Sequence, residues 1–261
     1  MKLSFCLETF YTEMPFDERL ECARADGVEH IEFWEWRDKS AHLTEQAMHH
    51  SGLQISNFSG NRRFGMIDPA DLELFLVEVP QSARFAQQLN CPRIMLLTQP
   101  LLADGRAKWN PRQSQNSSFD RVVTACQKAV QIADETGIEL VLEPLNDRDH
   151  PDYFLQTSGD GFAVIQAVNH PRLKLLYDVY HMAMMGIDVL PDIEEHLALI
   201  GYFHFADLPH RTEPGSGILP YDALMVMLQH AGYDGTIGFE CYPAPDAGPD
   251  LVPNLLRRFT I

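Results

Sequence analysis

The sequence has few of the features that indicate disulfides, a membrane or a nucleic acid. Its five cysteines are scattered and form no Cys-x-x-Cys pair, which is typical of free thiols in a reducing compartment. No apolar run approaches the about 20 residues that a membrane-spanning helix needs, so we expect no membrane partner. Lys and Arg total 20 against 37 acidic residues, which gives a net charge of −17. The basic residues also form no run along the sequence. Because such a surface repels polyanions, we expect no nucleic-acid partner.

Length and composition favour one cytoplasmic domain. Apolar residues make up 45% of the 261, enough for a single large core. The apolar stretch in the opening MKLSFCLE is too short for the hydrophobic region of a secretory signal. We therefore expect a cytoplasmic protein with one domain over residues 1–261.

Short apolar runs alternate with longer amphipathic ones along the whole chain. The apolar runs predict eight strands, at Lys2–Leu7, Val28–Trp34, Leu53–Ser59, Pro92–Thr98, Ile138–Glu143, Leu173–Asp178, Gly201–Ala206 and Thr236–Cys241. Helical patterns separate them, at Asp17–Ala25, Leu43–His50, Asp71–Leu89, Phe119–Thr136, Gly161–Val168, Asp192–Leu199 and Tyr221–Ala231. This alternation predicts an α/β fold with parallel strands, closed into a single (β/α)8 TIM barrel. An open doubly wound sheet is the alternative, but no glycine-rich phosphate-binding motif follows the first strand.

Four successive strands in the second half each carry a residue able to bind a metal near the carboxyl end. They are Glu143, Asp178, His204 and Glu240. Because these ends of barrel strands meet at one rim, we expect the four side chains to converge there. Three carboxylates and one imidazole suit one divalent cation, with Mn²⁺, Mg²⁺ or Co²⁺ favoured and Zn²⁺ or Fe²⁺ as alternatives. A structural zinc site would use cysteines.

The same strand ends carry a resemblance to a known family. VLEPLN (141–146), LLYDVYHM (175–182), YFHFADLPHRTEPGSG (202–217) and GFECYP (238–243) resemble the hydroxypyruvate isomerase group. That group belongs to the xylose isomerase-like TIM barrels, which also include ketose 3-epimerases and type IV endonucleases. Its members often carry Gln where this chain has His204, and a histidine there is more typical of the epimerases. They also tend to have Glu where this chain has Ile218.

The resemblance implies roles for individual residues. Glu143, Asp178, His204 and Glu240 would bind the metal, and Glu143 and Glu240 would also form the catalytic pair for proton transfer. His181 would contact the substrate. The implied activity interconverts an α-hydroxy ketone and an aldehyde through an enediolate. A small sugar or oxo-acid is therefore the expected partner.

Two further residues are candidates for substrate binding. Arg211 lies a few residues beyond the seventh strand and could pair with a substrate carboxylate, or alternatively with Glu213 or Asp207. Asn146 follows the Glu-Pro-Leu turn and could contact substrate or stabilise that turn. An effective carboxylate-binding Arg211 would favour an oxo-acid isomerase over a ketose 3-epimerase acting on a neutral sugar.

Other functions remain as alternatives at the level of the sequence. A phosphodiester hydrolase like the type IV endonucleases would need about three metals and extra histidines on earlier strands, where this chain has Asn57 and Thr98. A non-catalytic sugar-binding barrel would have no need for all four metal-binding residues. The polar stretch 99–118 is long enough to be a lid or only a surface loop. By resemblance to the superfamily, a homo-oligomer is expected.

Overall fold

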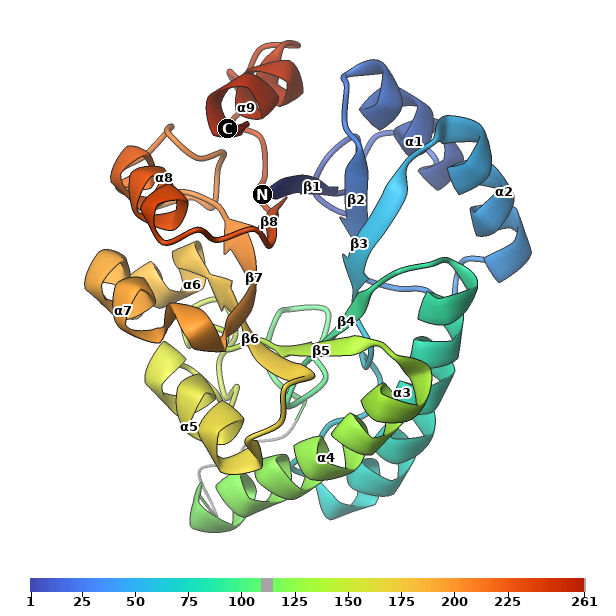
Figure 1. Cartoon of the computed structure of the whole chain (residues 1–261), viewed down its shortest axis with the longest axis vertical. Coiled ribbons are helices and arrows are strands. Elements are labelled where there is room, and N and C mark those ends of the chain that lie inside the picture. The colour runs from blue at the N-terminus through green and yellow to red at the C-terminus, as the bar shows by residue number, and fades with distance from the viewer. Residues whose placement is uncertain (109–114, 261) are drawn as a thin grey trace.

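The chain folds into an eight-stranded barrel surrounded by helices (Figure 1). The structure is a computed structural model that describes residues 1–108 and 115–260. Its strands are β1 (Lys2–Cys6), β2 (His30–Phe33), β3 (Gln54–Phe58), β4 (Arg93–Leu96), β5 (Glu139–Leu142), β6 (Leu173–Asp178), β7 (Ile200–Phe205) and β8 (Thr236–Phe239). The barrel expected from the sequence is confirmed. Strand β6 has the predicted bounds and β7 is shifted by one residue. The other six strands are shorter than the apolar runs because burial extends beyond the hydrogen-bonded ladder, as at Val28, which is fully buried ahead of β2.

All strand pairs are parallel, and the sheet closes on itself. The order is β3-β2-β1-β8-β7-β6-β5-β4, so neighbours in the barrel are neighbours in the chain except for β1 beside β8. The remaining seam lies between β3 and β4. There a parallel bridge joins Ser59 to Met95, and the Gly60 amide donates to the Met95 carbonyl at 2.7 Å. The carboxyl ends of all eight strands therefore reach one rim.

Helices cover the outside of the barrel and connect its strands (Figure 1). They are α1 (Phe16–Ala25), α2 (Ala41–Ser51), α3 (Pro69–Gln88), α4 (Gln115–Thr136), α5 (Ser158–Val168), α6 (Val179–Met184), α7 (Val189–His196), the 3-10 turn η2 (Leu197–Leu199), α8 (Tyr221–His230) and α9 (Leu251–Phe259). Each helix expected from the sequence is present with shifted ends. Gly52 ends α2 in the left-handed conformation, at φ 71°, which glycine adopts at little cost.

Two helices, α6 and α9, were not expected. The short α6 begins directly after β6, where the Asp178 carboxylate accepts a hydrogen bond from the His181 amide at 3.1 Å and caps the helix. The later α9 buries Val252, Leu255 and Phe259 on one face, at the helical spacing of three and four residues. The Phe259 ring lies 5.3 Å from that of Phe239 on β8, so α9 packs against the barrel wall.

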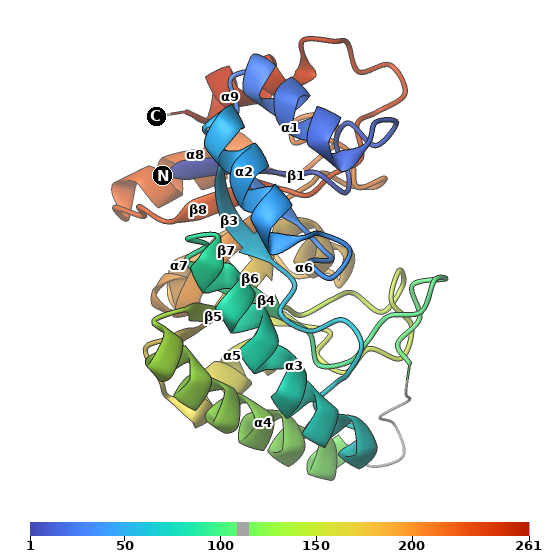
Figure 2. The same cartoon turned by 90° about the vertical axis from the view of Figure 1, so that its right-hand side faces the viewer.

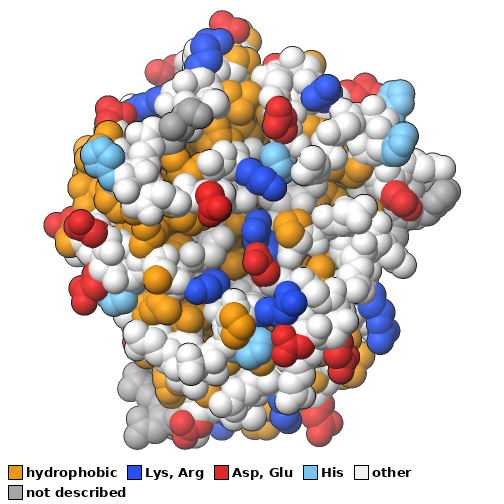
Figure 3. Space-filling view, viewed as in Figure 1, with side chains coloured by type: hydrophobic (Ala, Val, Ile, Leu, Met, Phe, Trp, Pro, Cys, Tyr) orange, Lys and Arg blue, Asp and Glu red, His pale blue; other side chains and the backbone are white. Residues whose placement is uncertain are grey.

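The two ends of the barrel differ. Figure 2 shows the amino terminus at one end and the long connecting loops at the other. Figure 3 shows the end where the strands begin, with Lys and Arg side chains gathered around the barrel axis. All five cysteines are free thiols, as expected. Within the described part of the chain, none of the helices has the length and apolar character to cross a membrane.

Candidate metal centre and active site

The four residues expected to bind a metal lie together at the carboxyl rim. Glu143 directly follows β5, Asp178 ends β6, His204 is the penultimate residue of β7, and Glu240 directly follows β8. One ligand-capable atom from each lies within 4.8 Å of the others, and all four side chains are buried. In the part of the chain that the structure describes, this is the one such group of metal-binding side chains.

The distances between these four side chains, and their negative charge, suit a bound cation. Nδ1 of His204 lies 3.3 Å from Glu143 Oε1, 3.5 Å from Glu240 Oε2 and 4.0 Å from Asp178 Oδ2. Burial raises the pKa of Glu143 to about 7 and that of Asp178 to about 6, because three acidic groups share a space closed to water. Crowded carboxylates of this kind are stabilised by a divalent ion, and the donor set of three carboxylates and one imidazole suits one.

A fourth acidic residue, Glu32, supports His204 and was not predicted from the sequence. Its Oε2 lies 3.2 Å from Nε2 of His204 and accepts a hydrogen bond from the Tyr202 hydroxyl at 2.8 Å. With the proton on Nε2 directed at Glu32, the Nδ1 lone pair faces the other carboxylates and can bind a cation. Gly238 leaves the necessary room, since a Cβ there would lie 2.5 Å from Glu32 Oε1. The available signal was a glutamate inside the apolar run HIEF of β2.

His181 is a neutral hydrogen-bonding group beside the centre. Burial, together with the charge of Arg211, lowers its pKa well below the usual value. Its Nδ1 lies 2.6 Å from Nδ2 of Asn146, while its buried Nε2 has no hydrogen-bond partner among the described residues. If the Asn146 amide donates to Nδ1, the proton of the neutral ring is on Nε2 and is available to a ligand.

Asn146 lies behind His181 rather than in the cavity. Its amide nitrogen contacts both His181 Nδ1 and Asp149, and its Oδ1 accepts from the backbone amides of Arg148 and Asp149. The side chain is fully buried. This arrangement combines the two alternatives raised by the sequence, since Asn146 stabilises its own turn and orients a residue that faces the cavity.

Arg211 is close to the centre and already paired. Its guanidinium forms ion pairs with Glu240 and, at 3.5 Å, with Asp178. The alternative partners considered from the sequence, Glu213 and Asp207, form no ion pair with it in the described structure. Burial opposes the ionisation of Glu240, but the charges of His204 and Arg211 outweigh it and lower the pKa of Glu240. Arg211 therefore stabilises the ionised form of the cluster.

A cavity of about 320 Å³ opens directly above the cluster. Glu143, His181, Arg211 and Glu240 form its floor and are joined by Trp34, Arg62, His150 and Tyr242. The cavity is also lined by four residues of the polar stretch 99–118, namely Leu101, Leu102, Ala103 and Gly105. The first part of stretch 99–118 is thus a wall of the cavity, whereas residues 109–114 lie outside the described residues.

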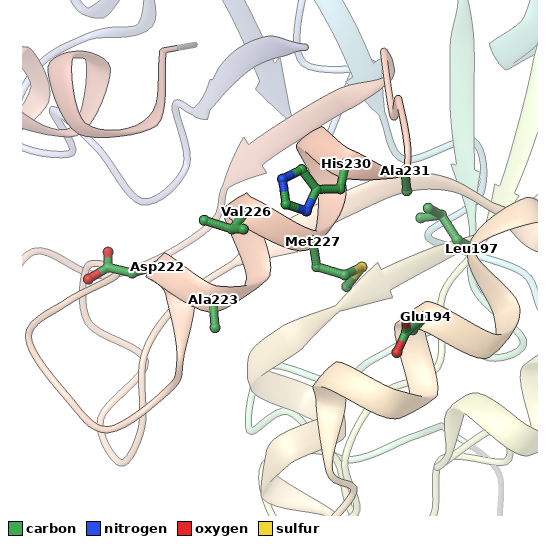
Figure 4. A pocket seen from close by; sticks show the side chains of 8 residues that line it. All are labelled: Glu194, Leu197, Asp222, Ala223, Val226, Met227, His230 and Ala231. Carbon is green, nitrogen blue, oxygen red and sulfur yellow. The ribbon is translucent and has the colours of Figure 1, made fainter.

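Two larger cavities lack a comparable group of converging ionisable side chains. The one of about 760 Å³ between α7 and α8 is shown in Figure 4, where Glu194, Asp222 and His230 do not converge on one point. The other, of about 520 Å³, lies at the opposite end of the barrel, and its lining includes Lys2 and Arg93. Of these three cavities, the one at the carboxyl rim is lined by Glu143 and Glu240 of the candidate metal-binding group.

Comparison with known proteins identifies the family of the chain. The model for the xylose isomerase-like TIM barrel matches residues 20–258, and the chain belongs to that family. It is 28% identical over 246 residues to the 2-oxo-tetronate isomerase of Cupriavidus necator, with 91% of each chain covered. It is 26% identical over 250 residues to the hydroxypyruvate isomerase of Escherichia coli, covering 93% of this chain and 94% of the relative.

A solved structure shows the same fold. The crystal structure described as an AP endonuclease of family 2 from Brucella melitensis superposes with a TM-score of 0.87 at 22% identity. The match covers 99% of this chain and 98% of that one. The resemblance to xylose isomerase-like barrels found in the sequence is thereby confirmed for both family and fold.

Proposed function

We propose that this protein is a metal-dependent isomerase of small sugars or oxo-acids that acts through an enediolate. The observation that carries the proposal is the buried group of Glu143, Asp178, His204 and Glu240, two of which, Glu143 and Glu240, line a cavity of about 320 Å³. A cavity of that size accommodates a small polar molecule. The relatives named as isomerases of hydroxypyruvate and 2-oxo-tetronate support the same reaction class.

The four clustered residues would hold one divalent cation, with Mn²⁺, Mg²⁺ or Co²⁺ favoured by the oxygen-rich donor set. When bound, such an ion supplies Lewis-acid stabilisation of negative charge on a substrate oxygen. Glu143 and Glu240 enter the cavity from β5 and β8. One of the pair takes a proton from the substrate carbon, and the proton is returned to the neighbouring carbon.

The surrounding residues position the substrate and exclude water. The unpartnered Nε2 of His181 donates a hydrogen bond to a substrate oxygen, and Asn146 holds the imidazole in that tautomer. Leu101 and Leu102 form an apolar wall that limits access of water to the enediolate. Each of these tasks uses groups already in place around the cavity.

A ketose 3-epimerase is the second candidate, favoured by the histidine at position 204. The two activities differ in which atoms change: an isomerase moves the carbonyl to a neighbouring carbon, from C2 to C3 in hydroxypyruvate, whereas a 3-epimerase inverts C3 and leaves the carbonyl in place. Purified protein loaded with Mg²⁺ would be incubated with hydroxypyruvate and, separately, with four- to six-carbon ketoses, and the products identified by NMR. Tartronate semialdehyde from hydroxypyruvate is the expected result. Inversion at C3 of a neutral ketose, without isomerisation of any oxo-acid, would select the epimerase.

A further inference from the structure

An arginine that the sequence did not single out projects into the cavity. Arg62 follows β3, and its guanidinium carbon lies 5.4 Å from the centre of the Trp34 ring. The same indole donates a hydrogen bond from Nε1 to Glu240 Oε1 at 2.5 Å. Trp34 therefore connects Arg62 to the Glu240 carboxylate, since one indole contacts both side chains.

The loop that carries Arg62 is held in place by a buried carboxylate. Glu78 on α3 is only 2% exposed and accepts hydrogen bonds from three successive backbone amides, at 3.2 Å from Arg62, 3.4 Å from Arg63 and 3.1 Å from Phe64. Glu78 is also paired with Arg37. Because the loop backbone is held before any ligand arrives, binding there orders little more than the Arg62 side chain, and the loss of entropy on binding is reduced.

Close packing against β4 restricts the loop further. The Asn61 side chain donates to the Leu97 carbonyl at 2.9 Å and accepts from the Leu97 amide at 3.0 Å. Beside it, a Cβ on Gly65 would lie 2.7 Å from the Thr98 carbonyl oxygen, so the backbone approaches β4 as closely as it can. The backbone of the loop is thus fixed, and the part of Arg62 that can still move is its side chain.

Arg62 differs from Arg37 and Arg211 in forming no ion pair within the described part of the chain. Arg37 pairs with Glu35 and Glu78, and Arg211 pairs with Asp178 and Glu240. No carboxylate among residues 1–108 and 115–260 lies within ion-pair distance of the Arg62 guanidinium, which instead faces the indole. Of the two arginines that line the cavity, Arg62 is therefore the one without an ion pair in the described structure, whereas one terminal nitrogen of Arg211 is paired with Asp178 and Glu240 and its Nε is buried without a partner.

We propose that Arg62 is the receptor for a carboxylate on the substrate, which makes short 2-oxo-acids with an adjacent hydroxyl the preferred substrate class. A guanidinium binds a carboxylate through two parallel hydrogen bonds, and Trp34 supports its plane. The inference rests on the proposed isomerase function for its catalytic consequence, and it moves the role considered for Arg211 to Arg62. A neutral sugar would leave these donors unpaired.

The test compares paired ligands that differ only in the carboxylate. Arg62→Gln removes the charge, Arg62→Lys keeps the charge but not the fork, and Arg63→Gln is the control, since Arg63 is the exposed neighbour on the same loop. Binding of D-glycerate and of glycerol to the Mg²⁺-loaded protein is measured by calorimetry. Turnover of hydroxypyruvate and of dihydroxyacetone, its neutral counterpart, is measured by NMR.

We expect Arg62→Gln to weaken D-glycerate binding on the order of 10- to 100-fold, which is the loss typical of a charge-assisted hydrogen-bonded pair. The same substitution should lower kcat/KM for hydroxypyruvate by a similar factor. Arg62→Lys should fall between, and Arg63→Gln should match the wild type. Equal losses for charged and neutral ligands, or D-glycerate binding unaffected by Arg62→Gln, would overturn the proposal. Arg62-dependent binding of D-glycerate without turnover of any substrate would refute the isomerase function and leave the carboxylate receptor standing.

Discussion

Replacing Glu32 by Gln should weaken metal binding although Glu32 is not one of the four ligands. Its Oε2 receives both the His204 Nε2 contact at 3.2 Å and the Tyr202 hydroxyl at 2.8 Å. A carboxylate in this place fixes the imidazole and raises the basicity of the nitrogen that faces the cation. Gln has the same shape but no charge, so the substitution removes the electrostatic part of the support.

The size of the effect follows from two contacts. Loss of charge weakens each hydrogen bond to about half, and outer carboxylates of this kind typically contribute 10- to 100-fold to metal affinity. Glu32 Oε1 is buried and has no partner in the described structure, so an amide nitrogen placed there would have no acceptor. We therefore expect Mn²⁺ affinity to fall by about 10-fold or more, equivalent to at least about 1.4 kcal/mol.

The assay follows free Mn²⁺ by its EPR signal during titration of the protein at alkaline pH. Alkaline conditions matter because Glu32 also helps to raise the pKa of His204, so at lower pH its loss would reduce proton competition and mask the effect. Tyr202→Phe is the matched control, because it removes a hydroxyl from the same carboxylate and leaves the His204 contact. An unchanged Kd for Glu32→Gln, with Mn²⁺ still bound at one site, would refute the account of His204 support.

Three other outcomes are expected. Mn²⁺ affinity should rise as the pH increases through about 7, because burial raises the pKa of Glu143 to about 7 and the ion must displace the proton of that carboxyl group. Measuring the protons released when Mn²⁺ binds at a fixed pH checks this. Mn²⁺ at 100 times its Kd should raise the free energy of unfolding by about 2.7 kcal/mol, and EDTA should reverse the gain in thermal melts. Gly217→Ala should cost about 1–3 kcal/mol in urea denaturation because its Cβ would lie 1.9 Å from the Leu208 carbonyl oxygen, whereas Gly248→Ala, with open space around it, should stay near wild type.

The sequence was sufficient to predict the barrel and to nominate the candidate metal-binding group. Strand ends are easy to find when an apolar run stops at a charged residue, as at Glu143 and Asp178. The parallel topology then brings such ends together whatever the details of packing. The convergence of ligand atoms within 4.8 Å is the structural counterpart of that pattern.

Interactions between distant strands could not be predicted in this way. Glu32 acts through His204, which is 172 residues away in the chain, and nothing in the short run of β2 identifies that partner. The roles of the two cavity arginines also depend on their neighbours: Arg211 is paired with Glu240, and Arg62 is held by Glu78 in a loop that presents its side chain without a partner. Such pairings are decided by packing across the barrel and not by residue type.

Proton NMR of Mg²⁺-loaded protein with hydroxypyruvate in D₂O, against Glu240→Gln, tests the central claim most directly. The account predicts appearance of tartronate semialdehyde and deuterium uptake from solvent with the wild type only, because Glu240 belongs to the pair that moves the proton. Mg²⁺ is used because it leaves the proton signals sharp. Equal deuterium uptake by Glu240→Gln would contradict the assigned proton transfer. Absence of exchange by the metal-loaded wild type, on hydroxypyruvate and on four- to six-carbon oxo-acids and ketoses alike, would contradict the isomerase function itself.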